Sequence, residues 1–196
     1  MSLDIVIAGV GGQGTVLASR IIASAAMRAG EKVFTSETIG MAQREGSVVS
    51  QVRIGEPLYG PQIPDGKAEI LLGLELAEAV RALPKLKPGG MVIVNSACLI
   101  PPSVARGESV YDREALQNYL REKTGICYLF DAFDLAREAG NVKSANVVML
   151  GAFSCLPGLP FTAEQLLAAV LAAVPPQTGA VNEKAFALGR QVMGGK

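Results

Sequence analysis

The sequence predicts an α/β protein: one three-layer domain with a mostly parallel central sheet and a Rossmann-like glycine turn after the first strand. The first observation is an apolar segment, "LDIVI", that runs into "AGVGGQG" and then into a helix-like stretch. The second is that short apolar strands and helices alternate along the rest of the chain. The third is that no repeat, low-complexity segment or long linker divides the 196 residues. We therefore expect residues 1–196 to form a single domain.

The composition is apolar, with 49% hydrophobic and 18% charged residues, and aromatic residues contribute only 5%. Two explanations stay open and are compatible: a parallel sheet buried on both faces, or broad apolar faces covered by another subunit.

Several classes of function are disfavoured by the bulk properties. Eighteen basic residues balance eighteen acidic ones, so no net charge favours nucleic acid or an anionic membrane. No apolar run reaches membrane-spanning length, and the first residues resemble a core strand rather than a signal peptide, so we expect a cytoplasmic protein. The three cysteines lack metal or cluster spacing, and the absence of histidine removes the commonest general base and metal ligand. We predict no catalytic residue and no metal site in this chain.

The N-terminal part predicts a βαβ unit. Residues 3–8 form a continuous apolar strand, and residues 13–29 form a helix with a small-residue face that Gly30 ends. A second strand is expected at 32–37. A right-handed crossover would join the two strands.

The middle of the chain predicts further strands and one helix. Residues 47–55 alternate in polarity, which is typical of a strand, here interpreted as antiparallel to its neighbours. The Pro/Gly-rich segment 56–66 is a loop, and 68–74 is a strand. A helix then begins at Glu75, Pro84 ends or bends it, and the turn and strand at 88–96 follow.

The C-terminal part is expected to be mainly helical. After a loop at 100–108, Asp112 caps a helix over 112–125, and a strand at 126–130 leads into a helix that ends at Ala139. Residues 144–156 suit a buried helix or a strand, and Ser144 as N-cap together with the length favours the helix. Two further helices are expected, one capped by Thr162 and the last over 178–195.

The glycine turn is the first candidate site. Gly9, Gly11 and Gly14 fit G-x-G-x-x-G between a strand and a helix, where free N–H groups and the helix dipole favour an anion. Glu37 has the spacing of an acid that binds the ribose of a dinucleotide. Gln13, a polar residue at the helix start, instead suits another ligand or a neighbouring chain. A dinucleotide, another phosphate-bearing ligand or subunit contact, and a purely structural turn all remain open.

A polar loop leaves the second strand at the same expected edge of the sheet. Residues 36–47 include Thr38, Gln43, Arg44 and Glu45 among glycines and serines. Because ligands of doubly wound folds bind along the carboxyl edge, we interpret this loop as part of the site. A solvated connection is the alternative.

Three segments carry a family resemblance that covers the chain from Ile5 to about Phe153. "GVGGQGTVLASRIIASAA", "ETIGMAQREGSVVSQVRIG" and "PDGKAEILLGLELAEA" resemble the gamma-type subunit or domain of 2-oxoacid:ferredoxin oxidoreductases. The second segment is most similar to the small subunit of indolepyruvate-type enzymes, and "NVKSANVVMLGA" resembles a later family segment. One departure is Arg44-Glu45-Gly46 in place of the family's usual Arg-Gly-Gly.

The resemblance implies a partial enzyme that is inactive alone. Such complexes oxidatively decarboxylate a 2-oxoacid to an acyl-CoA with thiamine diphosphate, Mg²⁺, [4Fe-4S] clusters and coenzyme A, and reduce ferredoxin. It implies that a large thiamine and iron–sulfur subunit is the partner and that this chain alone holds none of the cofactors. A self-sufficient NAD(P)-binding protein is one alternative, and a homologue that has lost its partner and acts, when isolated, as a binding module or a homodimer is the other.

The same resemblance suggests which residues bind the ligand. Gly11, Gly12, Gln13, Gly14 and Thr15 would form the anion-accepting turn. Arg44 would grip a phosphate or carboxylate with its guanidinium, although a salt bridge to Glu37 or Glu45 is the alternative. Ser47 would form a hydrogen bond nearby. Asn146 is interpreted as a helix-start hydrogen bonder, with a ligand contact as the alternative.

Overall fold

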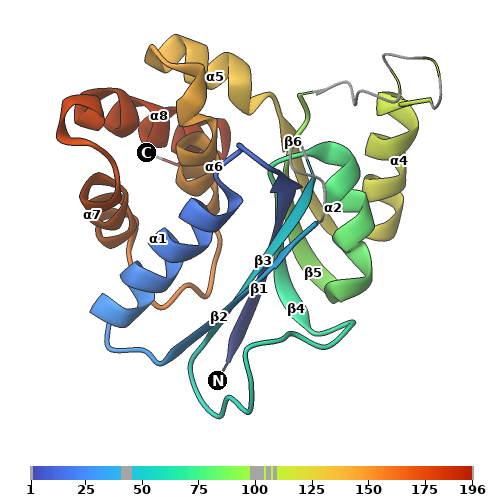
Figure 1. The fold of residues 1–196 in the computed structure, drawn as a ribbon, viewed down its shortest axis with the longest axis horizontal. Helices are drawn as coiled ribbons and strands as arrows, with labels where there is room; N and C mark the ends of the chain where they lie inside the picture. The colour runs from blue at the N-terminus through green and yellow to red at the C-terminus, as the bar shows by residue number, and fades with distance from the viewer. Residues whose placement is uncertain (1, 41–45, 98–103, 105–106, 108–109, 196) are drawn as a thin grey trace.

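The computed structural model describes residues 2–40, 46–97, 104, 107 and 110–195, and they form one α/β domain. A six-stranded sheet in the order β2-β3-β1-β4-β5-β6 is its middle layer. Figure 1 shows α1 and α5–α8 on one side of this sheet and α2 and α4 on the other. The predicted three-layer, mostly parallel fold is confirmed.

The strands lie close to the predicted segments. Their bounds are β1 Leu3–Val10, β2 Val33–Ile39, β3 Ser47–Ile54, β4 Ala68–Gly73, β5 Leu86–Asn95 and β6 Ile126–Phe130. Strands β1, β4, β5 and β6 pair in parallel, whereas β3 is antiparallel to both β1 and β2. The alternating segment at 47–55 is therefore an antiparallel strand, as its pattern indicated.

Strand β1 is interior because it must be buried on both faces. Ile5 and Ile7 belong to one hydrophobic core and Val6 and Ala8 to the other, and all four side chains are fully buried. A continuous apolar run is what a strand covered on both sides requires.

The strand beside β1 is β3, whereas the predicted βαβ unit would place β2 there. Strand β2 runs in the direction of β1, but β3 lies between them, because β3 turns back after residues 40–46 and pairs with both strands. The second strand of the predicted unit is therefore an edge strand and not a direct neighbour of the glycine turn.

The helices confirm most of the predicted boundaries and caps. Their bounds are α1 Thr15–Arg28, α2 Leu76–Ala82, α4 Arg113–Lys123, α5 Ala132–Ala139, α6 Ala145–Phe153, α7 Ala163–Ala173 and α8 Gly179–Val192, and short 3-10 turns lie at Leu83–Lys85, Val142–Ser144 and Pro176–Thr178. Asp112 accepts a hydrogen bond from the N–H of Ala115, and Thr162 forms a capping box with Gln165. Ser144 occupies the N-cap position of α6 without a side-chain bond to the helix.

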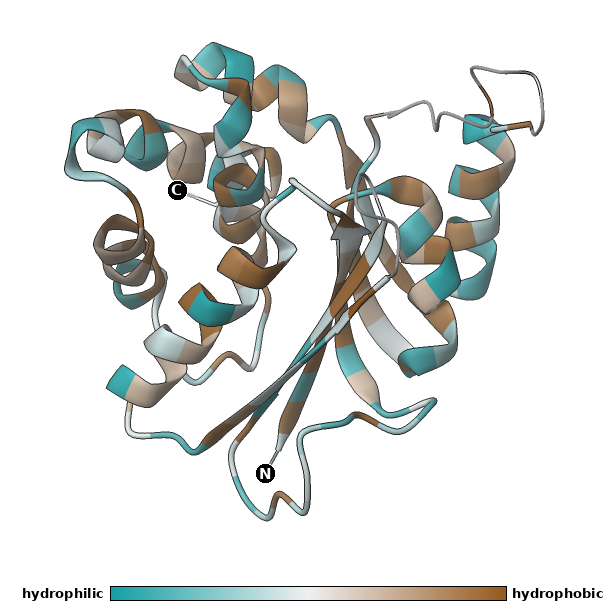
Figure 2. Ribbon diagram, viewed as in Figure 1, coloured by the Kyte–Doolittle hydropathy of each residue, from teal (hydrophilic) through white to brown (hydrophobic). Residues whose placement is uncertain are grey.

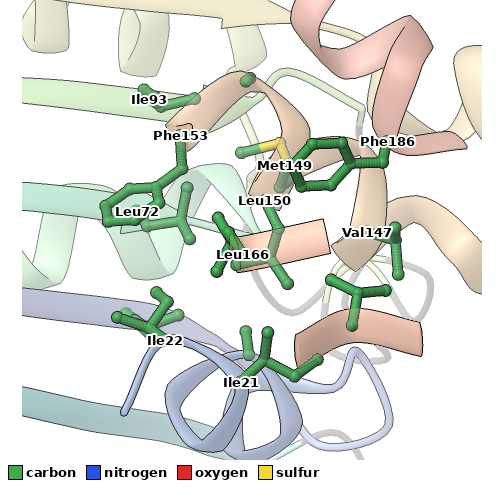
Figure 3. Close-up of a cluster of buried hydrophobic side chains, with 14 of the residues drawn as sticks. Ile21, Ile22, Leu72, Ile93, Val147, Met149, Leu150, Phe153, Leu166 and Phe186 are labelled. Carbon is green, nitrogen blue, oxygen red and sulfur yellow. The ribbon is translucent and has the colours of Figure 1, made fainter. Parts of the chain in front are cut away.

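Helix α6 is the centre of the larger core. Every residue from Ala145 to Phe153 is buried, which fits a segment whose periodicity alone did not separate helix from strand. Figure 3 shows Leu150 and Phe153 of α6 close to side chains from α1, α7 and the sheet. A Cβ at Gly151 would lie 2.1 Å from the carbonyl oxygen of Phe186, so glycine lets α8 pack directly on α6.

The helical layer that contains α4 is more polar than the layer that contains α6. Helix α4 alternates hydrophilic and hydrophobic bands in Figure 2, and only its Leu120 is fully buried. Within the described part of the chain, no helix has both the length and the apolar character needed to cross a bilayer.

Candidate functional site

The candidate site lies at the carboxyl edge of the sheet. The glycine turn follows β1, and the N–H of its Gly11 donates a hydrogen bond of 2.9 Å to the carbonyl oxygen of Gly46. This bond joins the glycine turn to the end of the polar loop that follows β2. The predicted convergence of the two loops is thus seen at Gly46, whereas Arg44 and Glu45 lie outside the described residues.

The turn depends on two glycines with positive φ angles. Gly12 has φ +91° and Gly14 has φ +81°, a region that side-chain-bearing residues rarely adopt. A Cβ at Gly14 would lie 2.4 Å from Nδ2 of Asn146, whereas a Cβ at Gly12 would have no heavy atom within 4 Å. Gly14 is therefore fixed by packing, and Gly12 is the open glycine of the turn.

Helix α1 begins in this turn without a side-chain cap. Gly14 is the N-cap residue, and the N–H groups of the first turn of an α-helix have no acceptor within the helix. The first turn holds no acidic residue, so the positive end of the dipole is not neutralised locally. Gly11 and Gly12 are exposed, but the N–H of Gly11 is already bonded to Gly46, so the N–H groups left for a ligand are those of Gly12 and of the first turn of α1.

Of the two polar atoms in the side-chain amide of Gln13, only one has a hydrogen-bond partner among the described residues. Its Oε1 accepts a hydrogen bond of 2.9 Å from the N–H of Val10 and so closes the turn. Its Nε2 is buried and has no hydrogen-bond partner among the described residues. The hydroxyl oxygen of Thr15 is likewise buried and unpartnered. Buried donors of this kind are costly unless a ligand or water accepts from them.

A small cavity lies behind the turn. It has a volume of about 10 Å³ and is lined by the amide side chains of Gln13, Asn95 and Asn146 together with the apolar residues Leu74, Phe133, Ala145 and Met149. That volume suits a single water molecule. Asn146 is 8% exposed and its side chain lies against Gly14. It therefore stands beside the start of α1 as well as inside α6.

Ser47 is bound to a buried carboxylate. Its hydroxyl donates a hydrogen bond of 2.6 Å to Oε2 of Glu78, which is 4% exposed. The other carboxylate oxygen of Glu78 pairs with the guanidinium of Arg81. Because its proton points to Glu78, Ser47 in this arrangement offers a ligand only an acceptor. The bond ties the start of β3 to the first turn of α2.

A second buried carboxylate organises the next loop along the edge. Glu75 caps α2 by accepting a hydrogen bond of 2.8 Å from the N–H of Glu78, and it also accepts one of 2.6 Å from the hydroxyl of Tyr111. Neither glutamate was predicted from the sequence to be a site residue. Their spacing, Glu-x-x-Glu at the start of a predicted helix, was an available sign of a cap.

Glu37 does not take the position that a dinucleotide site requires. It is exposed on β2, and β3 separates that strand from β1. In a dinucleotide fold, the ribose-binding acid ends the strand beside the glycine turn. The two features of the predicted NAD(P) site are therefore on strands that are not neighbours.

In the part of this edge that the structure describes, amide, hydroxyl and backbone donors surround the glycine turn. No cluster of three or more His, Cys, Asp or Glu side chains that could hold a metal ion is found among the described residues. Burial raises the pKa of the Cys127 thiol, so this thiol favours its protonated form. The N–H donors of the glycine turn and of the start of α1 are suited to binding an anionic group.

Comparison with known proteins defines the class. Residues 4–192 match the model of the pyruvate ferredoxin/flavodoxin oxidoreductase family, so the chain belongs to that family. Within it, the chain is 44% identical to indolepyruvate oxidoreductase subunit IorB of Thermococcus kodakarensis over 95% of this chain and 93% of that protein. It is 40% identical to the subunit of the same name from Methanothermobacter thermautotrophicus, with 95% of each chain covered.

A solved structure supports the same assignment. The gamma subunit of a keto/oxoacid ferredoxin oxidoreductase from Geobacter sulfurreducens superposes with a TM-score of 0.71 at 27% identity, covering 97% of this chain and 98% of that one. The gamma-type resemblance predicted from the three sequence motifs is confirmed.

Proposed function

We propose that this chain is the small subunit of an indolepyruvate-type 2-oxoacid:ferredoxin oxidoreductase. It would work with a large subunit that holds thiamine diphosphate, Mg²⁺ and [4Fe-4S] clusters. The support is the high identity to IorB proteins across nearly the whole chain. A cytoplasmic location is part of the same proposal.

Within that complex, we propose that the carboxyl edge binds an anion. The observation that carries this is the uncapped N-terminus of α1 behind an open Gly12, with the unpartnered Nε2 of Gln13 beside it. Gly11, Gly12, Gly14 and Thr15 supply the backbone of the turn. Arg44 would add a cation from the adjacent loop, and Ser47 would position the start of β3 through Glu78.

The anion is either a phosphate of coenzyme A or an acidic side chain of the large subunit. Both carry the negative charge that helix N-termini favour. The two buried carboxylates nearby have partners within the chain: the guanidinium of Arg81 pairs with Glu78, and Tyr111 and the backbone donate hydrogen bonds to Glu75.

The chemistry of decarboxylation belongs to the partner chain in this proposal. Thiamine diphosphate held by the partner would supply the electron sink for decarboxylation of the 2-oxoacid. The residues of this chain bind, orient and shield, and none of its described side chains is assigned a proton-transfer role.

Reconstitution tests the proposed function. The chain is combined with a large subunit of the same enzyme family, and reduction of ferredoxin is measured with a panel of 2-oxoacids and with coenzyme A. We expect activity that depends on both chains and on coenzyme A and that is highest with arylpyruvates. Equal activity of the large subunit alone, or NAD reduction by this chain alone, would contradict the proposal.

A further inference from the structure

Strand β2 is an edge strand without the usual protection against pairing. It is the last strand in the sheet order, and it pairs with β3 in unbroken register over its whole length. Its sequence, "VFTSETI", contains neither lysine nor proline and carries one charge. Native proteins normally block such an edge or cover it. A covering strand is therefore expected in the assembled protein.

The free backbone groups of β2 can be assigned from its ladder with β3. The N–H of Gly40 donates to Ser47 at 2.8 Å, and the N–H of Gly55 donates to Lys32 at 2.9 Å. Since bonded positions alternate along an antiparallel strand, the even-numbered residues of β2 face β3. The residues whose N–H and C=O groups point outward are Val33, Thr35, Glu37 and Ile39.

We propose that this edge pairs antiparallel with the same edge of a second copy of the chain, with the two-fold axis at Ser36. Val33 then lies opposite Ile39 of the second copy, and Thr35 lies opposite Glu37. Every outward residue meets an outward residue, so all free groups of the strand can bond. The result is an isologous interface, the commonest kind in homodimers.

Charge selects this register from its alternatives. Centring the pair on Glu37 would place two carboxylates directly opposite each other, which is destabilising. Centring it on Thr35 would place Ile39 opposite Glu31. Shifting by a single residue would set outward groups against residues bonded to β3. The register centred on Ser36 avoids all three faults.

The exposed apolar side chains of β2 support the same pairing. On the face that α1 covers, Ile39 is 66% exposed and would lie opposite Val33. There it reaches a groove of about 570 Å³ that Met27, itself 58% exposed, helps to line. On the other face, Phe34 is 43% exposed and would lie opposite Thr38. Cross-strand contacts of this kind stabilise paired strands.

Self-complementarity favours a second copy over an unrelated strand. An unrelated strand could bind this edge even if β2 did not match itself. Because β2 matches itself in backbone register, charge and apolar side chains, a second copy is the better candidate. The opposite edge strand, β6, has five residues against the seven of β2 and offers a shorter ladder.

The mass of the full-length chain in solution tests the interface. Light scattering coupled to gel filtration is expected to give twice 20.4 kDa for the unmodified chain. Thr35→Pro removes one outward N–H and no bond to β3, so it is expected to give a folded monomer. Ile39→Lys is expected to do the same. Ile126→Lys on β6, at a residue 43% exposed, is the matched control and should remain dimeric.

Cross-linking tests the register itself. Two Ser36 residues on the axis would form a non-hydrogen-bonded pair with Cα atoms about 4.5 Å apart, a separation that allows a disulfide. Ser36→Cys is therefore expected to give a covalent dimer on mild oxidation. Thr38→Cys should not cross-link, because it faces Phe34, whereas the Phe34→Cys/Thr38→Cys double variant should.

The outcomes separate this surface from the other possibilities. A monomeric unmodified chain without the Ser36→Cys dimer would overturn the proposal. So would a dimer that persists in both Thr35→Pro and Ile39→Lys. A monomer whose Thr35→Pro variant no longer binds the large subunit would assign the edge to that subunit instead. Circular dichroism of each variant confirms that it is folded.

Discussion

Gly12 is the residue on which the proposed anion site can be tested most directly. Its φ is +91°, and no heavy atom would lie within 4 Å of an added Cβ. Gly12→Val would place two methyl groups over the exposed N–H groups and strain the backbone. In the reconstituted complex, we expect an effect of about tenfold, ~1.4 kcal/mol, seen either as a higher KM for coenzyme A or as a weaker affinity between the subunits.

The two readouts identify the anion, and a second glycine controls for strain. A raised KM assigns the turn to coenzyme A, and weaker assembly assigns it to an acidic side chain of the partner. Gly30→Val is the matched control, because Gly30 has φ +90°, equally open surroundings, and a place just beyond the other end of α1. If the two variants behave alike in both assays, the turn has only a structural role.

Ser47 links the proposed site to the stability of the fold. Ser47→Ala removes the donor to a carboxylate that is 4% exposed, and hydrogen bonds to charged groups are worth about 1.5–3 kcal/mol. We expect urea unfolding to show a loss of that size. Ser154→Ala, which removes a short-range bond to the neutral carbonyl of Gly151, should cost about 1 kcal/mol or less. An equal loss in both variants would contradict the role of Glu78.

Cys127 provides a pH-dependent test. Partial burial raises the pKa of its thiol above the ordinary value, with smaller opposing effects of Thr124 and Arg121. Because the thiolate reacts, alkylation by iodoacetamide at mildly alkaline pH should be slower for Cys127 in the folded chain than in urea. Peptide mass spectrometry can follow this site alone. Because the folded chain favours the neutral thiol, the burial of Cys127 contributes to stability at pH values below the unfolded-state pKa of the thiol. This contribution is lost as the pH rises through the higher folded-state pKa. Folded-state alkylation as fast as that in urea would show that the thiol is not shielded.

At the scale of the elements, Asn95 connects three of them. It ends β5, its Oδ1 accepts from the N–H groups of Ala97 and Ala132, and its Nδ2 donates to the carbonyl of Leu74. Asn95→Ala would leave these groups buried without partners, at about 1–3 kcal/mol each. We expect a clearly lower thermal midpoint. Asn118→Ala, on the exposed side of α4, should change it little, and a similar effect of both substitutions would disprove this connection.

The sequence predicts elements whose signals are local and fails where pairing is long-range. The caps at Asp112 and Thr162 were predictable because a side chain bonds to the backbone three residues on. Inserting β3 between β1 and β2 was not predictable from local patterns, since it depends on contacts between residues far apart, such as Leu3 with Ile54. The alternation at 47–55 indicated an antiparallel strand but not its place in the sheet.

The candidate site shows the same division. Gly12 and Gly14 were predictable because a tight turn before a helix requires glycine. The partnership of Ser47 with Glu78 was not, because the two residues are 31 positions apart and meet only when β3 and α2 are placed on the sheet. From the sequence, Ser47 was therefore predicted to form a hydrogen bond near the ligand, whereas in the fold its hydroxyl donates a hydrogen bond to the carboxylate of Glu78.

For the whole molecule, the central prediction is that the isolated chain performs no 2-oxoacid oxidation. It contains no histidine and three cysteines without cluster spacing, and its described residues form no metal-binding group. Purified alone, the chain is expected to be colourless, to contain no stoichiometric iron, and to reduce neither ferredoxin nor a dye with any 2-oxoacid. Iron analysis and visible absorption measure this directly, and adding the large subunit should restore activity without further iron entering this chain. A brown preparation with stoichiometric [4Fe-4S] on the isolated chain would show that the electron-transfer centres are not confined to the partner, and the division of labour proposed between the two subunits would be wrong.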